Sequence, residues 1–152
     1  LHPPHSLPTS GITPVTLPSL LRCEAASAHA VYPHRLFEVG KIARRDATEP
    51  SGTITFTNLG FLLADGEAGF NDVSEHLSGL LYYLGISYRL RACTDPRFSP
   101  GRAAEVVVGN SQIPAGRIGE LHPELLEEWA LQMPCAACEL GIEALAASGG
   151  SM

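Results

Sequence analysis

The stretch Gly116-Arg117-Ile118-Gly119-Glu120-Leu121-His122-Pro123-Glu124 carries the most information about the fold of this chain. Its first half predicts the end of a β-strand, and Pro123 suits the first position of a short helix. His122 would form an acid/base pair with Glu120 or Glu124, or bind a metal beside them, if these side chains converged. The proline directly after His122 favours a plainer interpretation, in which the histidine closes the strand and starts the helix.

Outward from this stretch, hydrophobic periodicity predicts a mixed order of elements. The clearest helix spans 70–84, where apolar residues recur every three or four positions, and another spans 18–31. Strands are predicted at 35–43, 53–63, 86–91, 102–108, 113–121 and 135–142, and loops at 44–52, 64–69 and 94–101. Hairpins outnumber crossovers, so we expect an α+β domain with an antiparallel sheet and helices packed on one side.

The composition limits the function. The chain has 152 residues, of which 45% are hydrophobic and 17% charged, with a net charge of −6. The length is enough for one domain with a core. The negative net charge disfavours binding of nucleic acid over a wide basic surface. No apolar run is long enough for a membrane span, and no secretory signal is visible, so we expect a cytoplasmic protein.

Three segments are expected along the chain. Residues 1–13 predict an irregular proline-rich arm, because dense proline blocks regular structure. Residues 14–147 predict the folded domain, and 148–152 a flexible tail. The first residue is Leu1 rather than methionine, so we expect a fragment or a processed chain.

The only cysteine motif is Cys135-Ala136-Ala137-Cys138. A structural zinc site needs four ligands, and no second pair of the usual spacing occurs. Alternation in a strand would point the two thiols to opposite faces. We expect buried, inert thiols, with a metal-binding or redox site as the alternative.

Several charged residues are candidates for a ligand or an interface. Arg102 and Arg117 lie at strand edges, where an arginine can hold phosphate or carboxylate in a bidentate manner, or simply lie on the surface. Glu38 and Glu139 lie inside apolar strands. Alternation allows Glu139 to face solvent, whereas it favours burial of Glu38 with an arginine partner.

Six segments in order resemble the phenylalanyl-tRNA synthetase beta chain, in its C-terminal catalytic-like domain of the class II synthetase type. They cover about residues 14–142 and are TLPSLL at 16–21, RLFEVGKI at 35–42, FNDVSE at 70–75, PGRAAEV at 100–106, GRIGELHPE at 116–124 and ACEL at 137–140. One departure is that the lysine-glycine that the family has after Asp72 is here Ser74-Glu75. The modules that precede this domain in the family are absent, so we expect an excised domain or a stand-alone relative.

The resemblance implies a class II synthetase core without catalytic residues, which supports assembly with the catalytic alpha chain. The complete enzyme would use ATP and magnesium to charge tRNA(Phe), with no cofactor or metal in this domain. An oligomer is expected, with Leu20, Leu21 and Ala28 at the subunit interface unless they are core residues.

Two other hypotheses compete with this one. The first is a free-standing small-molecule enzyme or binding protein that reuses the class II fold, with Arg102, Glu120 and His122, or Glu38, at its site. The second is a metal-binding module at Cys135 and Cys138.

Overall fold

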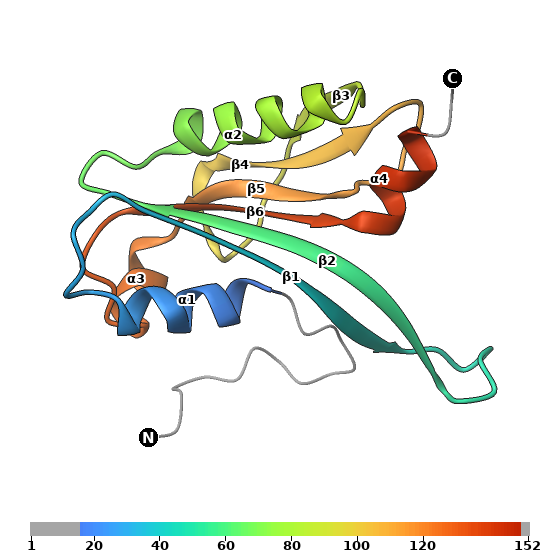
Figure 1. The fold of residues 1–152 in the computed structure, drawn as a ribbon, viewed down its shortest axis with the longest axis horizontal. Coiled ribbons are helices and arrows are strands. Elements are labelled where there is room, and N and C mark those ends of the chain that lie inside the picture. Colours follow the sequence, from blue (N-terminus) through green and yellow to red (C-terminus); the bar gives the residue numbers. More distant parts are fainter. Residues whose placement is uncertain (1–15, 150–152) are drawn as a thin grey trace.

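The computed structural model describes residues 16–149, in which six strands form one antiparallel sheet of order β1-β2-β6-β5-β4-β3 (Figure 1). The strands are β1 (His34–Arg45), β2 (Thr53–Ala64), β3 (Tyr88–Ala92), β4 (Phe98–Val108), β5 (Gly116–Leu121) and β6 (Cys135–Gly141). Every neighbouring pair is antiparallel, which confirms the predicted α+β class. The predicted arm at 1–13 lies outside the described residues.

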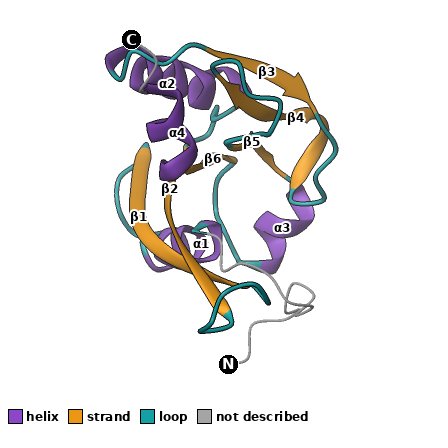
Figure 2. Cartoon of the chain, turned by 90° about the vertical axis from the view of Figure 1, so that its right-hand side faces the viewer, coloured by secondary structure: helices purple, strands orange, loops and turns teal. Residues whose placement is uncertain are grey.

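The helices lie on both faces of the sheet rather than on one. Helices α1 (Leu17–Ala26) and α3 (Pro123–Glu128) cover one face, and α2 (Phe70–Tyr83) and α4 (Ile142–Gly149) cover the other (Figure 2). The prediction of one-sided packing is therefore wrong. Strand β6 shows the reason, because Cys135–Leu140 are buried at six successive positions, as in a strand that is covered on both faces.

Two apolar clusters result, one on each face. The larger lies under α2 and α4 and includes Val73, Leu77, Leu81, Ile118, Leu140 and Leu145. The smaller lies under α1 and α3 and includes Leu17, Leu20, Leu21, Leu62, Phe98 and Leu121. Leu77 and Leu81 are fully buried, so the apolar stripe predicted for 70–84 is the core face of α2.

Several element boundaries differ from the prediction. Helix α1 ends at Ala26 rather than near residue 31, because the amides of Ser27 and Ala30 bond three residues back and close tight turns. Strands β1 and β4 extend into predicted loops, because their partners continue the ladder, as in the pair Phe98–Leu121.

The end of the chain also differs. Residues 142–149 form α4, which was not predicted. Its alanines, leucine and glutamate favour a helix, and Leu145 anchors it in the larger cluster. The predicted tail at 148–152 is therefore wrong for 148–149, and 150–152 lie outside the described residues. Within residues 16–149, no helix is long and apolar enough to cross a membrane.

Candidate functional site

Four side chains of alternating charge lie across the face of the sheet that α1 covers. Neighbouring members face each other in register from β3 to β6, and we call them the charged row: Arg91, Glu105, Arg117 and Glu139. Arg91 donates from Nε to Glu105 at 2.8 Å, and a guanidinium nitrogen of Arg117 lies 3.7 Å from the same carboxylate. Opposite charges at facing positions stabilise a sheet by about 0.2–1 kcal/mol per pair. The charged row therefore favours this strand register while it neutralises its own charges.

Asp95 and Arg97, in the loop before β4, contact Arg117 and Glu139, the two members of the charged row on β5 and β6. The Asp95 carboxylate accepts hydrogen bonds from Arg97 at 2.8 Å and from Arg117 at 3.0 Å, and Arg97 also donates to Glu139. Burial by itself would raise the pKa of Asp95, but the hydrogen bonds from Arg97 and Arg117 outweigh it and lower the pKa to about 2. The guanidinium groups of Arg97 and Arg117 are thus paired with carboxylates of the chain itself. Unpaired arginines, in contrast, would be available to bind an anionic ligand.

The start of α1 is attached to the same cluster through Glu139. This residue is 6% exposed, and its second carboxylate oxygen accepts from the Thr16 hydroxyl at 3.2 Å and from the Leu17 amide at 3.1 Å. A carboxylate is favourable there because the first amides of a helix lack partners within it. Residue 60 must be glycine for this contact, since a Cβ on Gly60 would lie 2.2 Å from Oγ1 of Thr16.

The burial of Glu38 and Glu139, the two glutamates inside apolar strands, is the reverse of that expected. Glu139, expected to face solvent, is the buried one. Glu38, expected to be buried with an arginine partner, is only half-buried, and it forms no ion pair within residues 16–149. Position in the sheet decides the outcome, because β6 is a central strand and β1 is an edge strand.

Arg102, Glu120 and His122 do not converge on one site. Glu120, with Arg102 near it, lies at the start of α2, whereas His122 lies at the start of α3. Arg102 and Glu120 come within 3.9 Å of each other, and Glu120 accepts from the Phe70 amide at 2.8 Å, at the start of α2. His122 is the N-cap of α3, on the other face, and its Nδ1 accepts from the Glu124 amide at 3.1 Å. Glu120 and His122 thus each satisfy a helix amide, a role that needs no ligand.

The predicted interface residues Leu20, Leu21 and Ala28 differ in their burial. Leu20 and Leu21 are 3% and 2% exposed and belong to the smaller apolar cluster, so they are core residues. Ala28 is half-buried in the turn after α1. The leucines cannot contact a partner without unfolding of this face.

The cysteines follow the strand alternation. Cys135 and Cys138 lie in the clusters on opposite faces of the sheet, and both are buried free thiols. Burial raises the pKa of both thiols, that of Cys135 to about 12. Within residues 16–149, no group of three or more histidine, cysteine or carboxylate side chains is arranged to hold a metal ion.

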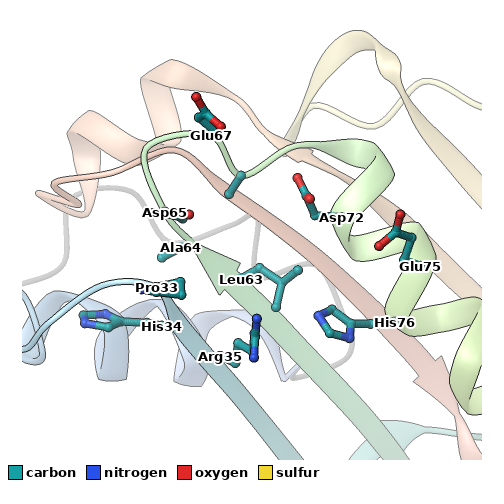
Figure 3. Close-up of a pocket in the computed structure, with 11 residues that line it drawn as sticks. Pro33, His34, Arg35, Leu63, Ala64, Asp65, Glu67, Asp72, Glu75 and His76 are labelled. Carbon is teal, nitrogen blue, oxygen red and sulfur yellow. The ribbon is translucent and has the colours of Figure 1, made fainter.

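A hollow of about 300 Å³ lies where β1 and β2 meet the start of α2 (Figure 3). We call it the acidic hollow, because its charged wall groups include the four carboxylates of Asp65, Glu67, Asp72 and Glu75. Arg35 and His76 also line it. None of the four carboxylates forms an ion pair within the described part of the chain, although Asp72 accepts from the Gly69 amide at 2.9 Å. The hollow is therefore a concentration of negative charge.

An apolar groove of about 410 Å³ adjoins the acidic hollow and runs between β1 and α2. Its wall includes Phe37, Val39, Leu59, Phe61 and Leu80. Phe37 and Val39 are 76% and 56% exposed, and they project from a 12-residue strand at the edge of the sheet. An apolar groove beside an unpaired strand edge is a surface to which another chain would bind.

Asp95 and Arg97 were not among the sequence candidates. They lie in the segment 94–101, which was predicted as a loop, and their partners Arg117 and Glu139 are 22 and 42 residues away. The only local signal was an oppositely charged pair just before a strand.

Comparison with known proteins relates the chain to one family. Residues 4–142 match the family described as phenylalanyl tRNA synthetase beta chain CLM domain. The phenylalanine–tRNA ligase beta subunit of Treponema pallidum is 46% identical over 129 residues, and that of Thermococcus gammatolerans is 40% identical over 129 residues. Each alignment covers 85% of this chain, but only 21% and 22% of those subunits. The chain thus spans about a fifth of the length of these relatives.

Proposed function

Since this chain belongs to the phenylalanyl-tRNA synthetase beta chain family, we propose that it is a non-catalytic structural domain of the beta subunit that docks on the alpha chain. The observation that carries the proposal is the apolar groove along β1. Phe37 and Val39 expose apolar surface there, beside backbone groups of β1 that have no strand partner among residues 16–149. Both features are typical of a surface that another subunit covers.

The pairing of charges within the chain supports a structural role. Arg117 of the charged row and the neighbouring Arg97 form ion pairs with Asp95, Glu105 and Glu139. Binding a phosphate there would require breaking these pairs, and a buried charge that loses its partner is strongly destabilising.

The wider setting is part of the same proposal. A helix, a long edge strand and a six-stranded antiparallel sheet suit a core of the class II synthetase type. In the complete enzyme, the alpha chain would carry ATP and magnesium and charge tRNA(Phe), in the cytoplasm. Phe37 and Val39 replace Leu20 and Leu21 as the interface residues, because the two leucines are buried.

Co-purification tests the proposal. The full chain is co-expressed with the cognate alpha chain, and a tag on one of them is used for capture. Recovery of both chains in one complex is expected. Absence of binding at micromolar concentrations, with both chains folded, would overturn the proposal.

A further inference from the structure

The floor of the apolar groove is an uncovered part of the sheet. It consists of Phe37 and Val39 on β1 and of Leu59 and Phe61 on β2. The register places Phe37 opposite Phe61 and Val39 opposite Leu59, so the four side chains form one continuous apolar patch. The two residues of β1 are exposed and the two of β2 are half-buried, so this patch lacks a covering layer within residues 16–149.

The width of this floor matches one helix. Helix α2 packs mainly on β5 and β6, and the groove separates it from β1. The strand pair β1 and β2 lies two strand spacings, about 10 Å, from the pair β6 and β5. Helices that pack side by side are separated by about 8–10 Å. A second helix therefore fits beside α2, whereas a strand added at the edge of the sheet would leave the floor open.

One side of α2 forms the wall of the groove. His76 and Leu80 line the groove, and in Figure 3 the side chain of His76 extends from α2 toward β1 and β2. Tyr83 follows at the next helical step on the same side and is 87% exposed. Its neighbour Tyr82 is 81% exposed but lies about 100° further around the helix axis. The wall therefore offers contacts to a partner over about two helical turns.

The acidic hollow continues the groove at one end. Arg35, Leu63 and His76 line both the hollow and the groove. Four carboxylates outnumber the guanidinium of Arg35 in the hollow, so this end of the groove is negative. A positive side chain on the occupant is therefore favoured at this end.

We propose that the alpha chain fills the groove with an amphipathic helix, which packs beside α2 on β1 and β2. The floor from Arg35 to Val39 is about 13 Å long, which corresponds to between two and three helical turns. The apolar stripe of the docking helix covers Phe37 and Val39, and a lysine or arginine at one end of the stripe enters the acidic hollow. This inference rests on the proposed function and adds the kind of element with which the partner docks.

Two adjacent tyrosines test the position of the docking helix. Isothermal titration calorimetry of the cognate alpha chain into the full chain compares Tyr83→Glu with the matched control Tyr82→Glu. Tyr83→Glu should weaken binding about tenfold or more, because it places a charge in the wall of the groove, and Tyr82→Glu should leave binding unchanged.

Two exposed glutamates test the direction of the docking helix. Glu75 lines the acidic hollow, whereas Glu128 lies on α3 at the opposite face of the sheet. Glu75→Lys should weaken binding about threefold or more and make it less sensitive to salt. Glu128→Lys changes the net charge by the same amount and should leave the affinity and its salt dependence unchanged.

Hydrogen–deuterium exchange of the alpha chain in the complex identifies the docking segment. The protected segment should carry apolar residues at three- and four-residue steps, with a lysine or arginine at one end. Failure of the unmodified chain to bind the alpha chain would overturn the proposed function together with this inference. Binding that Tyr83→Glu and Glu75→Lys leave unchanged, or protection of a segment that alternates with a period of two, would overturn the docking helix alone.

Discussion

Arg97 donates a hydrogen bond to Glu139 across 42 residues of sequence, and this buried pair joins the loop before β4 to the central strand β6. The same glutamate accepts from the first residues of α1. Three separate parts of the chain therefore depend on one carboxylate.

Replacement of that carboxylate should be strongly destabilising. Glu139→Ala leaves Arg97 with one partner fewer and leaves the Thr16 hydroxyl and the Leu17 amide without an acceptor. We expect a loss of about 3 kcal/mol in the free energy of unfolding. Chemical denaturation measures it, with Arg91→Ala as the control. Arg91 belongs to the same row but its side chain is 46% exposed, so the control should lose about 1 kcal/mol or less. Equal losses would contradict this account of the cluster.

Asp95 should make folding sensitive to acid. Its pKa is lowered in the folded chain from 3.8 to about 2, so its contribution is complete above the ordinary pKa and is lost as the pH falls through the folded one. The shift corresponds to about 2 kcal/mol. Denaturation curves between pH 5 and 2 should therefore show a smaller loss of stability for Asp95→Asn than for the unmodified chain. Parallel pH profiles would show that Asp95 is not the group responsible.

Two glycines should respond in opposite directions to alanine. A Cβ on Gly116 would lie 1.7 Å from the carbonyl oxygen of Glu139, so Gly116→Ala must push β5 away from β6. A Cβ on Gly79, in the helix α2, would meet nothing within 4 Å. Gly79→Ala should raise the stability by up to about 1 kcal/mol, since alanine favours a helix. Thermal unfolding of the two variants checks the contrast, and a Gly116→Ala variant as stable as the unmodified chain would refute the packing described for the strand that starts at Gly116.

Three of the four thiols should react in a fixed order. Cys23 is exposed, whereas Cys135 and Cys138 are buried with a raised pKa. A chromogenic thiol reagent should modify Cys23 first in the native chain, and Cys135 and Cys138 only after denaturant is added. Fast native modification of either buried thiol, located by peptide mass spectrometry, would instead support the reactive or metal-binding alternative.

Local pattern predicted most of the fold. The apolar stripe at 70–84 appears as α2, because spacing along a helix is a local property. The alternation that separates Cys135 from Cys138 holds for the same reason. The stretch Gly116–Glu124 ends a strand and starts α3 as expected, with His122 as the N-cap.

Features that depend on distant residues could not be predicted in this way. Alternation along β1 and β6 does not reveal which strand is central, so Glu38 and Glu139 were assigned to the wrong environments. Arg97 lies in a segment that resembles a loop, and its partner Glu139 becomes adjacent only when β4, β5 and β6 pair. Local pattern also does not show which face of the sheet a helix covers, so α1 and α2 were placed on one side although they lie on opposite faces. Helix α4 was missed, since residue 142 was assigned to the last strand, 148–149 to the tail and 143–147 to no element.

The exposed edge at β1 is the central claim, and binding of the alpha chain to surface variants tests it most directly. Titration of the cognate alpha chain into the full chain would compare Phe37→Glu with the control Ile113→Glu, two large apolar residues that are 76% and 78% exposed. We expect Phe37→Glu to weaken binding by about tenfold or more, since it places a charge in the apolar groove, while Ile113→Glu leaves it unchanged. Equal affinity of the two variants would contradict the assignment of β1 as the docking surface.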